Sequence, residues 1–388
     1  MRFIHISDLH LGKNLNGYSL LQQQEKCLQQ VVDLALSKAC DALFIAGDIY
    51  DKTSPSNEAI SLFDRFLTQL HMHTPQLKIC IIAGNHDSFA KLSYGKELLE
   101  KNNIYIQAYP LSENEILKSL YIKDEYGMVK ITFAPFCKPS YLLYENKMEG
   151  MTYTQMFNEM LNRSHYDASM RHVLLAHQFF VNANGQVLTS ESEVLPLVMG
   201  GLDSIDLSQL DVKFHYMAFG HLHRFQQMGK LPAYYSGSIY PYSISEAYDT
   251  KGVIYGQMDG EGKVDVELIP LIADKKIQVI TGEFNEIMQQ YHNRIFNDYV
   301  AVKLTSPCYD PNLQSKLLTL FPNLLEVTLS NASNNLTETR DNNEDQNIDG
   351  KDPLYYLQSL MKTMQGKSLT QEQTVYLQNL LEQINEAN

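Results

Sequence analysis

Five apolar runs in this chain end abruptly in Asp, Asn or His. The runs and the residues that close them are Arg2–Ile6 before Ser7-Asp8-Leu9-His10, Asp41–Ala46 before Gly47-Asp48, Lys78–Ile82 before Ala83-Gly84-Asn85-His86, His172–Ala176 before His177, and Tyr216–Phe219 before Gly220-His221-Leu222-His223. Runs of this length and composition predict buried strands. Because ligands of layered α/β folds bind outside the carboxyl ends of the strands, we expect these polar residues to meet at one place.

Amphipathic stretches lie between the strands. Apolar residues at helical spacing predict helices over 20–39, 57–70, 92–102 and 153–161. The first of these makes the opening of the chain a βαβ unit. Alternating apolar positions at 104–106, 120–122 and 129–133 predict the start of a second sheet. Short strands over 233–238, 252–256 and 264–269 are expected to close that second sheet in antiparallel fashion, around turns such as Asp259-Gly260.

The pattern changes beyond Pro270. Strand, helix, strand, helix and strand are predicted in turn over 277–282, 285–292, 299–305, 311–320 and 324–329, which is enough for a separate small domain. The next stretch is dominated by Asn, Asp, Ser, Thr and Glu and predicts a flexible linker. Two amphipathic helices follow it, and they either pack back on the main body or dock on another protein. The predicted parts are thus 1–270, 271–330, a linker over 331–352 and a helical pair over 353–388.

Composition narrows the class of protein. The 388 residues are 44% hydrophobic and 20% charged, as in ordinary globular chains, and no apolar run approaches bilayer length. We therefore expect a cytoplasmic protein with no membrane contact. The five cysteines are spaced singly, which suits a reducing compartment and argues against a thiolate zinc site. A formal charge of -14 argues against strong binding of DNA by this chain alone.

The polar residues at the strand ends form a set of mixed nitrogen and oxygen ligands. The candidate metal ligands are Asp8, His10, Asp48, Asn85, His177, His221 and His223. This set suits two divalent ions, with manganese or iron more natural than a structural zinc bound by thiolates. Asp48 is the best candidate for a carboxylate shared by both ions. Water held by two such ions is acidic enough to attack phosphorus at neutral pH, so the pattern predicts phosphoester hydrolysis.

Neighbouring residues offer proton transfer. His86 follows the presumed ligand Asn85, and its imidazole can donate a proton to the leaving oxygen. Asp51 lies in the same loop as Asp48 and is predicted to orient and polarise His86. Asp87 either supports a ligand or caps its loop. His5 alternates with apolar residues in the first strand and is interpreted as a hydrogen-bonded core histidine.

These residues occur in a familiar order. Asp8-x-His10, Gly47-Asp48-x-x-Asp51, Gly84-Asn85-His86-Asp87, the lone His177 and Gly220-His221-x-His223 resemble the motifs of the calcineurin-like metallophosphoesterase superfamily. Within it, the chain is most similar to the family of bacterial SbcD nuclease subunits. That closer resemblance rests on His10-Leu11-Gly12, on Ser190–Glu193 followed by Gly200-Gly201, and on Tyr235–Ser238 with Glu246 downstream. Ile239 departs from the pattern, which has proline there.

The resemblance implies a two-layered β-sandwich core flanked by helices, a small capping domain, and C-terminal helices that bind an SbcC-type ABC ATPase. It implies Mn²⁺ as the ion, and ATP-regulated double-strand exonuclease and single-strand or hairpin endonuclease activity in DNA repair, recombination and replication. It also implies a homodimer within a heterotetramer, associated with the nucleoid when on DNA. By the same resemblance Asp8, His10, Asp48 and His223 hold one ion, Asp48, Asn85, His177 and His221 hold the other, and His86 is catalytic.

Two other functions use the same residues. A metallophosphoesterase for nucleotide phosphates or other small phosphoesters would have the same site, but it has no evident need for a small C-terminal domain and tethered helices. A non-catalytic scaffold is the third alternative, and the complete set of ligands argues against it.

Overall fold

The computed structural model describes residues 1–109, 116–145, 150–164, 166–182, 187–193, 204–292 and 294–329. The predicted linker and the helical pair lie outside the described residues, as do Gly200 and Gly201. Within these described ranges, no helix has the length and apolar character needed to cross a membrane.

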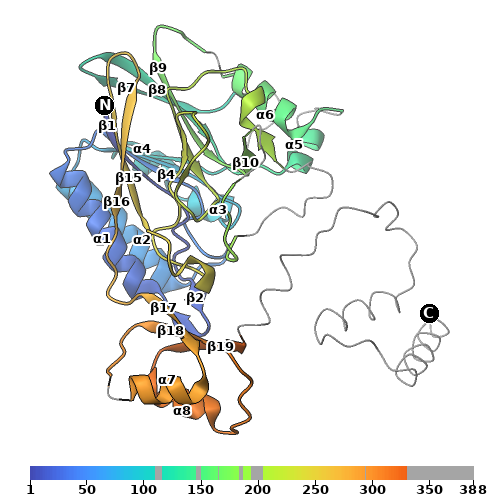
Figure 1. Ribbon diagram of the computed structural model, residues 1–388. Coiled ribbons are helices and arrows are strands. Elements are labelled where there is room, and N and C mark those ends of the chain that lie inside the picture. The colour runs from blue at the N-terminus through green and yellow to red at the C-terminus, as the bar shows by residue number, and fades with distance from the viewer. Residues whose placement is uncertain are drawn as a thin grey trace, which may run out of the picture. The chain divides into compact units, whose positions relative to one another are not determined.

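Two six-stranded sheets form the body of the protein (Figure 1). The first has the order β16 (Val264–Pro270), β15 (Gly252–Met258), β1 (Arg2–Ile6), β4 (Ala42–Ala46), β5 (Lys78–Ile82) and β6 (Ile104–Gln107). The second has the order β13 (Gln226–Gln227), β14 (Ala233–Tyr235), β12 (Tyr216–Gly220), β9 (Arg171–His177), β8 (Gly127–Ala134) and β7 (Ser119–Asp124).

Helices cover the outer faces of both sheets, which gives four layers (Figure 1). The first sheet is covered by α1 (Leu21–Ser37) and α2 (Asn57–His73), and the second by α5 (Pro139–Glu145) and α6 (Tyr153–Asn162). The shorter elements are β2 (Asn14–Leu15), β3 (Tyr18–Ser19), β10 (Phe180–Val181), β11 (Ile205–Asp206) and 3₁₀ turns at Leu207–Gln209 and Ile244–Glu246. The predicted fold class, a two-layered sandwich flanked by helices, is confirmed.

Strand β1 shows how side-chain alternation builds these layers. Phe3 packs between the two sheets, whereas Ile4 and Ile6 face the helices on the other side. His5 points between the sheets with Phe3, where its Nδ1 lies 3.0 Å from the Tyr216 hydroxyl and its Nε2 lies 3.1 Å from the Phe219 carbonyl oxygen. His5 is therefore a hydrogen-bonded core histidine, as interpreted from the sequence, and it ties one sheet to the other.

The sequence prediction assigned three strands to the wrong sheet. Strand β6 pairs with β5 in parallel, and the antiparallel hairpin of β15 and β16 pairs with β1, so all three belong to the first sheet. Alternation locates a strand but does not identify its neighbour. The unit of β1, α1 and β4 leaves the far edge of β1 unpaired, and β15 pairs with that edge and so satisfies its backbone groups.

The helix predicted over 92–102 is also wrong. Two short helices occupy that region instead, α3 (Phe89–Leu92) and α4 (Lys96–Glu100). Gly95 lies between them with a φ of 70°, a left-handed conformation that ends a helix and that glycine adopts without strain.

A third, smaller sheet follows β16. Its three parallel strands are β17 (Ile277–Gly282), β18 (Tyr299–Leu304) and β19 (Leu324–Leu329), with α7 (Phe284–Tyr291) and α8 (Leu313–Leu320) packed on it (Figure 1). The β2–β3 hairpin contacts this sheet through Asn16, whose side-chain amide donates to the Leu325 carbonyl oxygen at 3.0 Å. The element order is the predicted one, while the boundaries proposed for the separate domains stay predictions.

The fold brings the polar strand ends together. In the first sheet β1, β4 and β5 run parallel to one another, and in the second β9 runs parallel to β12. The five strands therefore deliver the residues that follow them to the same end of the sandwich.

Candidate metal centre

The loops after β1 and β4 support each other through their backbones. The Asp8 N–H donates to the Gly47 carbonyl oxygen at 3.1 Å, and the His10 N–H donates to that of Asp48 at 2.9 Å. Asp8, His10 and Asp48 all have positive φ, at 51°, 41° and 50°. Backbone strain of this kind persists where surrounding structure enforces it and concentrates at functional sites.

Two glycines let the loops approach this closely. A Cβ atom on Gly84 would overlap the Asp48 carboxylate, and one on Gly47 would overlap the His177 ring. Gly47 also has a φ of 86°, which L residues with a side chain rarely adopt. The glycine that precedes Asp48 and the one that precedes Asn85 are thus required by close packing around the site.

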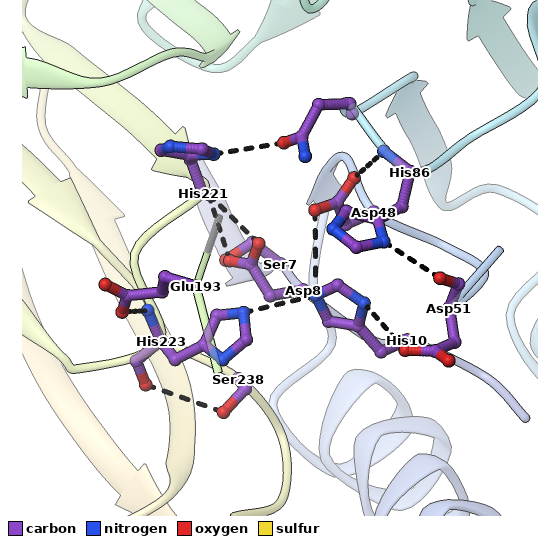
Figure 2. A network of polar contacts seen from close by, with 12 residues as sticks. Ser7, Asp8, His10, Asp48, Asp51, His86, Glu193, His221, His223 and Ser238 are labelled. Carbon is purple, nitrogen blue, oxygen red and sulfur yellow. Dashed lines mark hydrogen bonds and ion pairs between the residues drawn. The ribbon is translucent and has the colours of Figure 1, made fainter. Parts of the chain in front are cut away.

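Asp48 lies at the centre of the cluster (Figure 2). Its Oδ2 is 3.6 Å from His10 Nε2 and 3.4 Å from His177 Nε2, while its Oδ1 accepts from the His86 backbone N–H at 2.8 Å. Burial works to raise the pKa of the Asp48 carboxyl, but His177 beside it holds that pKa well below its usual value. Burial works to lower the pKa of His177, and attraction to Asp48 raises it to about 9.

The other predicted ligands surround Asp48. Asn85 Oδ1 lies 3.1 Å from His177 Nε2 and 3.0 Å from His221 Nδ1. His10 Nε2 and His223 Nε2 face each other at 3.1 Å, and the Asp8 carboxylate accepts from the His221 backbone N–H at 3.0 Å (Figure 2). All seven predicted ligand residues are therefore brought together. Their role as metal ligands stays a prediction.

The donor set fits divalent cations. Ligand atoms of Asp8, His10 and His223 lie within 4.8 Å of one another, as do those of Asp8, Asp48 and His177. Among the described residues, His221 Nε2 is a buried ring nitrogen with no hydrogen-bond partner. A buried polar atom without a partner is costly, and coordination of a cation by ring nitrogens and carboxylates would remove that cost.

The prediction that the Asp51 carboxylate orients His86 is wrong. His86 Nδ1 donates to the Asp51 backbone carbonyl oxygen at 2.8 Å. The Asp51 carboxylate pairs instead with Lys13 at 2.9 Å and lies 3.7 Å from His10 Nδ1. The hydrogen bond to His86 is made by the main chain of Asp51, so the sequence identified the partner residue but not the group. The bond fixes a hydrogen on Nδ1 and leaves Nε2 of His86 for the substrate.

The sequence left two roles open for Asp87, which were support of a metal ligand and capping of its own loop. In the structure its side chain bonds to the backbone of two loops. Its carboxylate accepts from the backbone N–H groups of Ile49, Tyr50 and Gly84 at 3.1, 3.0 and 2.9 Å. Burial, reinforced by nearby Asp48, raises the pKa of Asp87 to about 6. Asp87 therefore caps and joins the loops that carry Asp48 and Asn85.

Gln24 is a residue that sequence reasoning missed. It is fully buried on α1, and its amide donates to the carbonyl oxygens of Leu9 and His10 at 3.0 and 2.8 Å. Its Oε1 accepts from the Gly12 N–H at 3.1 Å. The signal for it was a polar residue on the apolar face of a helix, in line with Leu28 and Val31.

A cavity of about 1040 Å³ opens beside the cluster and is lined by residues that include Lys13, Lys52, Asn85, His86, Phe136 and Phe179. Three lysines, Lys13, Lys52 and Lys138, line the same cavity as His86, where a phosphate would be attracted. Several basic residues near the loops are also engaged within the protein, since Lys13 pairs with Asp51, Lys91 donates to Thr53 and Arg224 pairs with Asp249.

Comparison with known proteins agrees with this geometry. Residues 1–225 match the family model described as calcineurin-like phosphoesterase, and residues 274–365 match the one described as type 5 capsule protein repressor C-terminal domain. The chain is also 30% identical over 98% of its length, and 98% of the relative's length, to the SbcD subunit of nuclease SbcCD from Staphylococcus epidermidis. The chain belongs to the SbcD-type calcineurin-like metallophosphoesterases.

This SbcD-type chain is accordingly a metal-dependent phosphodiesterase, and the family resemblance inferred from its motifs is confirmed. Among solved structures, it is similar to GAP50, the anchor in the inner membrane complex of Plasmodium. That similarity has a TM-score of 0.39 at 9% sequence identity and covers 80% of this chain and 98% of the other.

Proposed function

We propose that this chain is the nuclease subunit of a complex with an SbcC-type ATPase, and that it hydrolyses DNA phosphodiester bonds with two Mn²⁺ ions. The proposed reactions are ATP-regulated exonuclease cleavage of double strands and endonuclease cleavage of single strands or hairpins. The name of the Staphylococcus epidermidis relative, which makes that protein part of a nuclease, supports this assignment. The proposed assembly contains a homodimer of this chain, with the partner bound through residues 353–388.

The observation that carries the proposal is the position of Asp48 between two groups of ligands. Asp48 lies 3.6 Å from His10, whose ring faces His223, and 3.4 Å from His177, which contacts Asn85. We assign Asp8, His10, Asp48 and His223 to one ion, and Asp48, Asn85, His177 and His221 to the other. When bound, divalent ions polarise phosphoryl oxygens and lower the pKa of water.

His86 is proposed to act on the leaving group. Its ring borders the cavity, and its Nδ1 is held by the Asp51 carbonyl oxygen. A protonated His86 can therefore donate from Nε2 to the oxygen that leaves phosphorus, or stabilise negative charge that develops there. Lys13 and Lys52 line the same cavity and would attract the phosphates of the substrate.

The test is degradation of a linear duplex by the full chain with Mn²⁺, measured with and without an SbcC-type partner and ATP. A small phosphodiester is assayed beside it. We expect duplex degradation only with partner and ATP, and loss of both reactions when the ions are removed with a chelator. Hydrolysis of the small ester with no attack on DNA under either condition would overturn the proposal in favour of a small-substrate phosphoesterase.

A further inference from the structure

The polar groups of His223 are held almost entirely by one buried cluster behind the metal centre. The His223 backbone N–H donates to Glu193 at 2.6 Å, and its carbonyl oxygen accepts from Lys251 Nζ at 2.7 Å. Its Nδ1 lies 2.6 Å from the Ser192 hydroxyl oxygen. Only Nε2 is left to face His10 (Figure 2). The cluster therefore holds the backbone and the ring Nδ1 of His223 and leaves Nε2 for the proposed metal.

Hydrogen-bond direction in this cluster is determined by Glu246. This residue is fully buried, and its carboxylate accepts from the hydroxyls of Ser192 and Ser243 and from Lys251 Nζ. Lys251 Nζ lies 2.6 Å from the Glu246 carboxylate and forms an ion pair with it, and an ionised carboxylate is a hydrogen-bond acceptor only.

The Ser192 hydroxyl consequently gives its hydrogen to Glu246 and accepts from His223. The hydrogen of the neutral imidazole is thereby placed on Nδ1, and Nε2 keeps the lone pair that a metal ligand needs. The residues involved come from distant parts of the chain, with Ser192 in the 187–193 segment and Glu246 in the 3₁₀ turn Ile244–Glu246.

We propose that Ser192 and Glu246 are positioning residues that set the tautomer and orientation of His223, so that its Nε2 binds one of the two ions. This inference rests on the proposed role of His223 as a metal ligand. Groups that hydrogen-bond a ligating histidine raise metal affinity in this way, and their loss lowers affinity by about 10- to 100-fold.

The experiment compares Mn²⁺ binding by the full chain and three variants, using calorimetry for affinity and stoichiometry. Ser192→Ala removes the hydroxyl between His223 and Glu246, and Ser192→Thr restores one. Ser190→Ala is the matched control, because the Ser190 hydroxyl lies in the same segment and contacts that of Ser192 at 3.0 Å rather than His223 or Glu246. Glu246→Gln is avoided as the main variant, since it removes the nearer of the two carboxylates that pair with the buried Lys251.

We expect Ser192→Ala to weaken one of the two Mn²⁺ sites by about 10- to 100-fold and to leave the other unchanged. Ser192→Thr and Ser190→Ala should bind both ions as the wild-type chain does. Phosphodiester hydrolysis by Ser192→Ala should recover at high Mn²⁺, as expected when the affinity for the ion is lowered.

Wild-type affinity at both sites of Ser192→Ala would overturn this inference alone. An equal loss of affinity in Ser190→Ala would overturn it as well, since the effect would then belong to the segment rather than to the hydroxyl. Failure of the wild-type chain to bind two ions would overturn the proposed function together with this inference.

Discussion

His86 is the residue whose removal best separates binding of the ions from turnover. Its ring borders the cavity but is not among the seven proposed ligands. We expect His86→Ala to lower the rate of phosphodiester hydrolysis by about 10²-fold or more, because proton transfer to the leaving oxygen is lost. Mn²⁺ stoichiometry, measured by calorimetry, should remain at the wild-type value. A near-normal rate in this variant would remove His86 from the reaction.

Asp51 provides a contrasting prediction. Because the Asp51 main chain holds His86, Asp51→Asn retains the 2.8 Å hydrogen bond to the imidazole. The substitution removes the charge that faces Lys13 and His10. We therefore expect the rate to fall by less than about tenfold, far less than in His86→Ala. The measurement is the rate of small-ester hydrolysis at saturating Mn²⁺, and an equal loss in the two variants would mean that the carboxylate does act through His86.

The outcome for Asp51 shows what the sequence can predict at a site. Residue types and spacing predicted which seven side chains meet, because parallel strands ending in Asp, Asn and His bring them to one edge. Spacing places a residue near another but does not tell which of its groups makes the contact. Gln24 was missed for a related reason, since its partners are backbone atoms of another loop and the hydroxyl of Tyr242, which lies far away in the sequence.

At the scale of elements, α1 supports two loops with adjacent glutamines. Gln24 holds the loop of Leu9, His10 and Gly12, while the Gln23 side chain accepts from the Asp274 and Lys275 backbone N–H groups at 2.9 and 3.1 Å. Both glutamines are buried. One helix therefore holds both the metal loop and the segment that leads into β17 of the small sheet.

This arrangement predicts different results for two matched substitutions. Gln24→Leu leaves backbone groups of the metal loop unpaired, so we expect a loss of about 2 kcal/mol in the free energy of unfolding and weaker Mn²⁺ binding. Gln23→Leu should give a similar loss of stability with Mn²⁺ affinity unchanged. Urea unfolding and calorimetry measure the two quantities. Equal Mn²⁺ affinities in both variants would show that α1 does not control the metal loop.

A second link between elements is the ion pair made by Asp124, the last residue of β7. Arg171 at the start of β9 donates to the Asp124 carboxylate at 2.9 Å and to the Asp259 carbonyl oxygen, in the turn between β15 and β16, at 3.0 Å. The pair is largely buried, and Arg171 therefore connects the second sheet to the first. Burial works to raise the pKa of Asp124, but Arg171 holds it well below its usual value.

This depressed pKa predicts an acid-dependent loss of stability. A carboxylate whose folded pKa is lowered stabilises the protein above its unfolded pKa, and the stabilisation is lost as pH falls. We expect Asp124→Asn to lower the free energy of unfolding by about 2 kcal/mol at neutral pH. The difference in the free energy of unfolding between this variant and the wild-type chain should shrink as pH falls below about 4. Urea unfolding between neutral and acid pH checks this, and a difference that grows toward acid pH would contradict it.

The assignment of strands to sheets could not be read from the sequence. Strands β6, β15 and β16 were each located from the sequence, yet all three were assigned to the wrong sheet. Residues of β15 pack on both faces, with Val253 and Tyr255 toward the helices and Ile254 toward the other sheet. Burial on both faces is possible in either sheet, so local pattern does not decide between them. The unpaired edge of β1 determines that β15 joins the first sheet, and that edge exists only in the assembled fold.

At the scale of the whole molecule, the charge of the chain bears on how it meets DNA. A formal charge of -14 repels a polyanion, even though Lys13 and Lys52 line the cavity. Bound divalent ions would offset some of the carboxylates only at the site itself. The proposed function therefore requires that most of the affinity for DNA comes from the partner.

Removal of residues 352–388 tests whether DNA degradation depends on a partner bound through these residues. With Mn²⁺, the shortened chain should hydrolyse a small phosphodiester at the wild-type rate, because every proposed ligand and His86 lie before residue 224. It should lose the duplex degradation that needs partner and ATP, since the predicted docking helices are gone. His86→Ala in the full chain is the control that loses both reactions. If the shortened chain degraded duplex with partner and ATP as well as the full chain does, the partner would bind elsewhere, and the affinity for DNA would not depend on these helices.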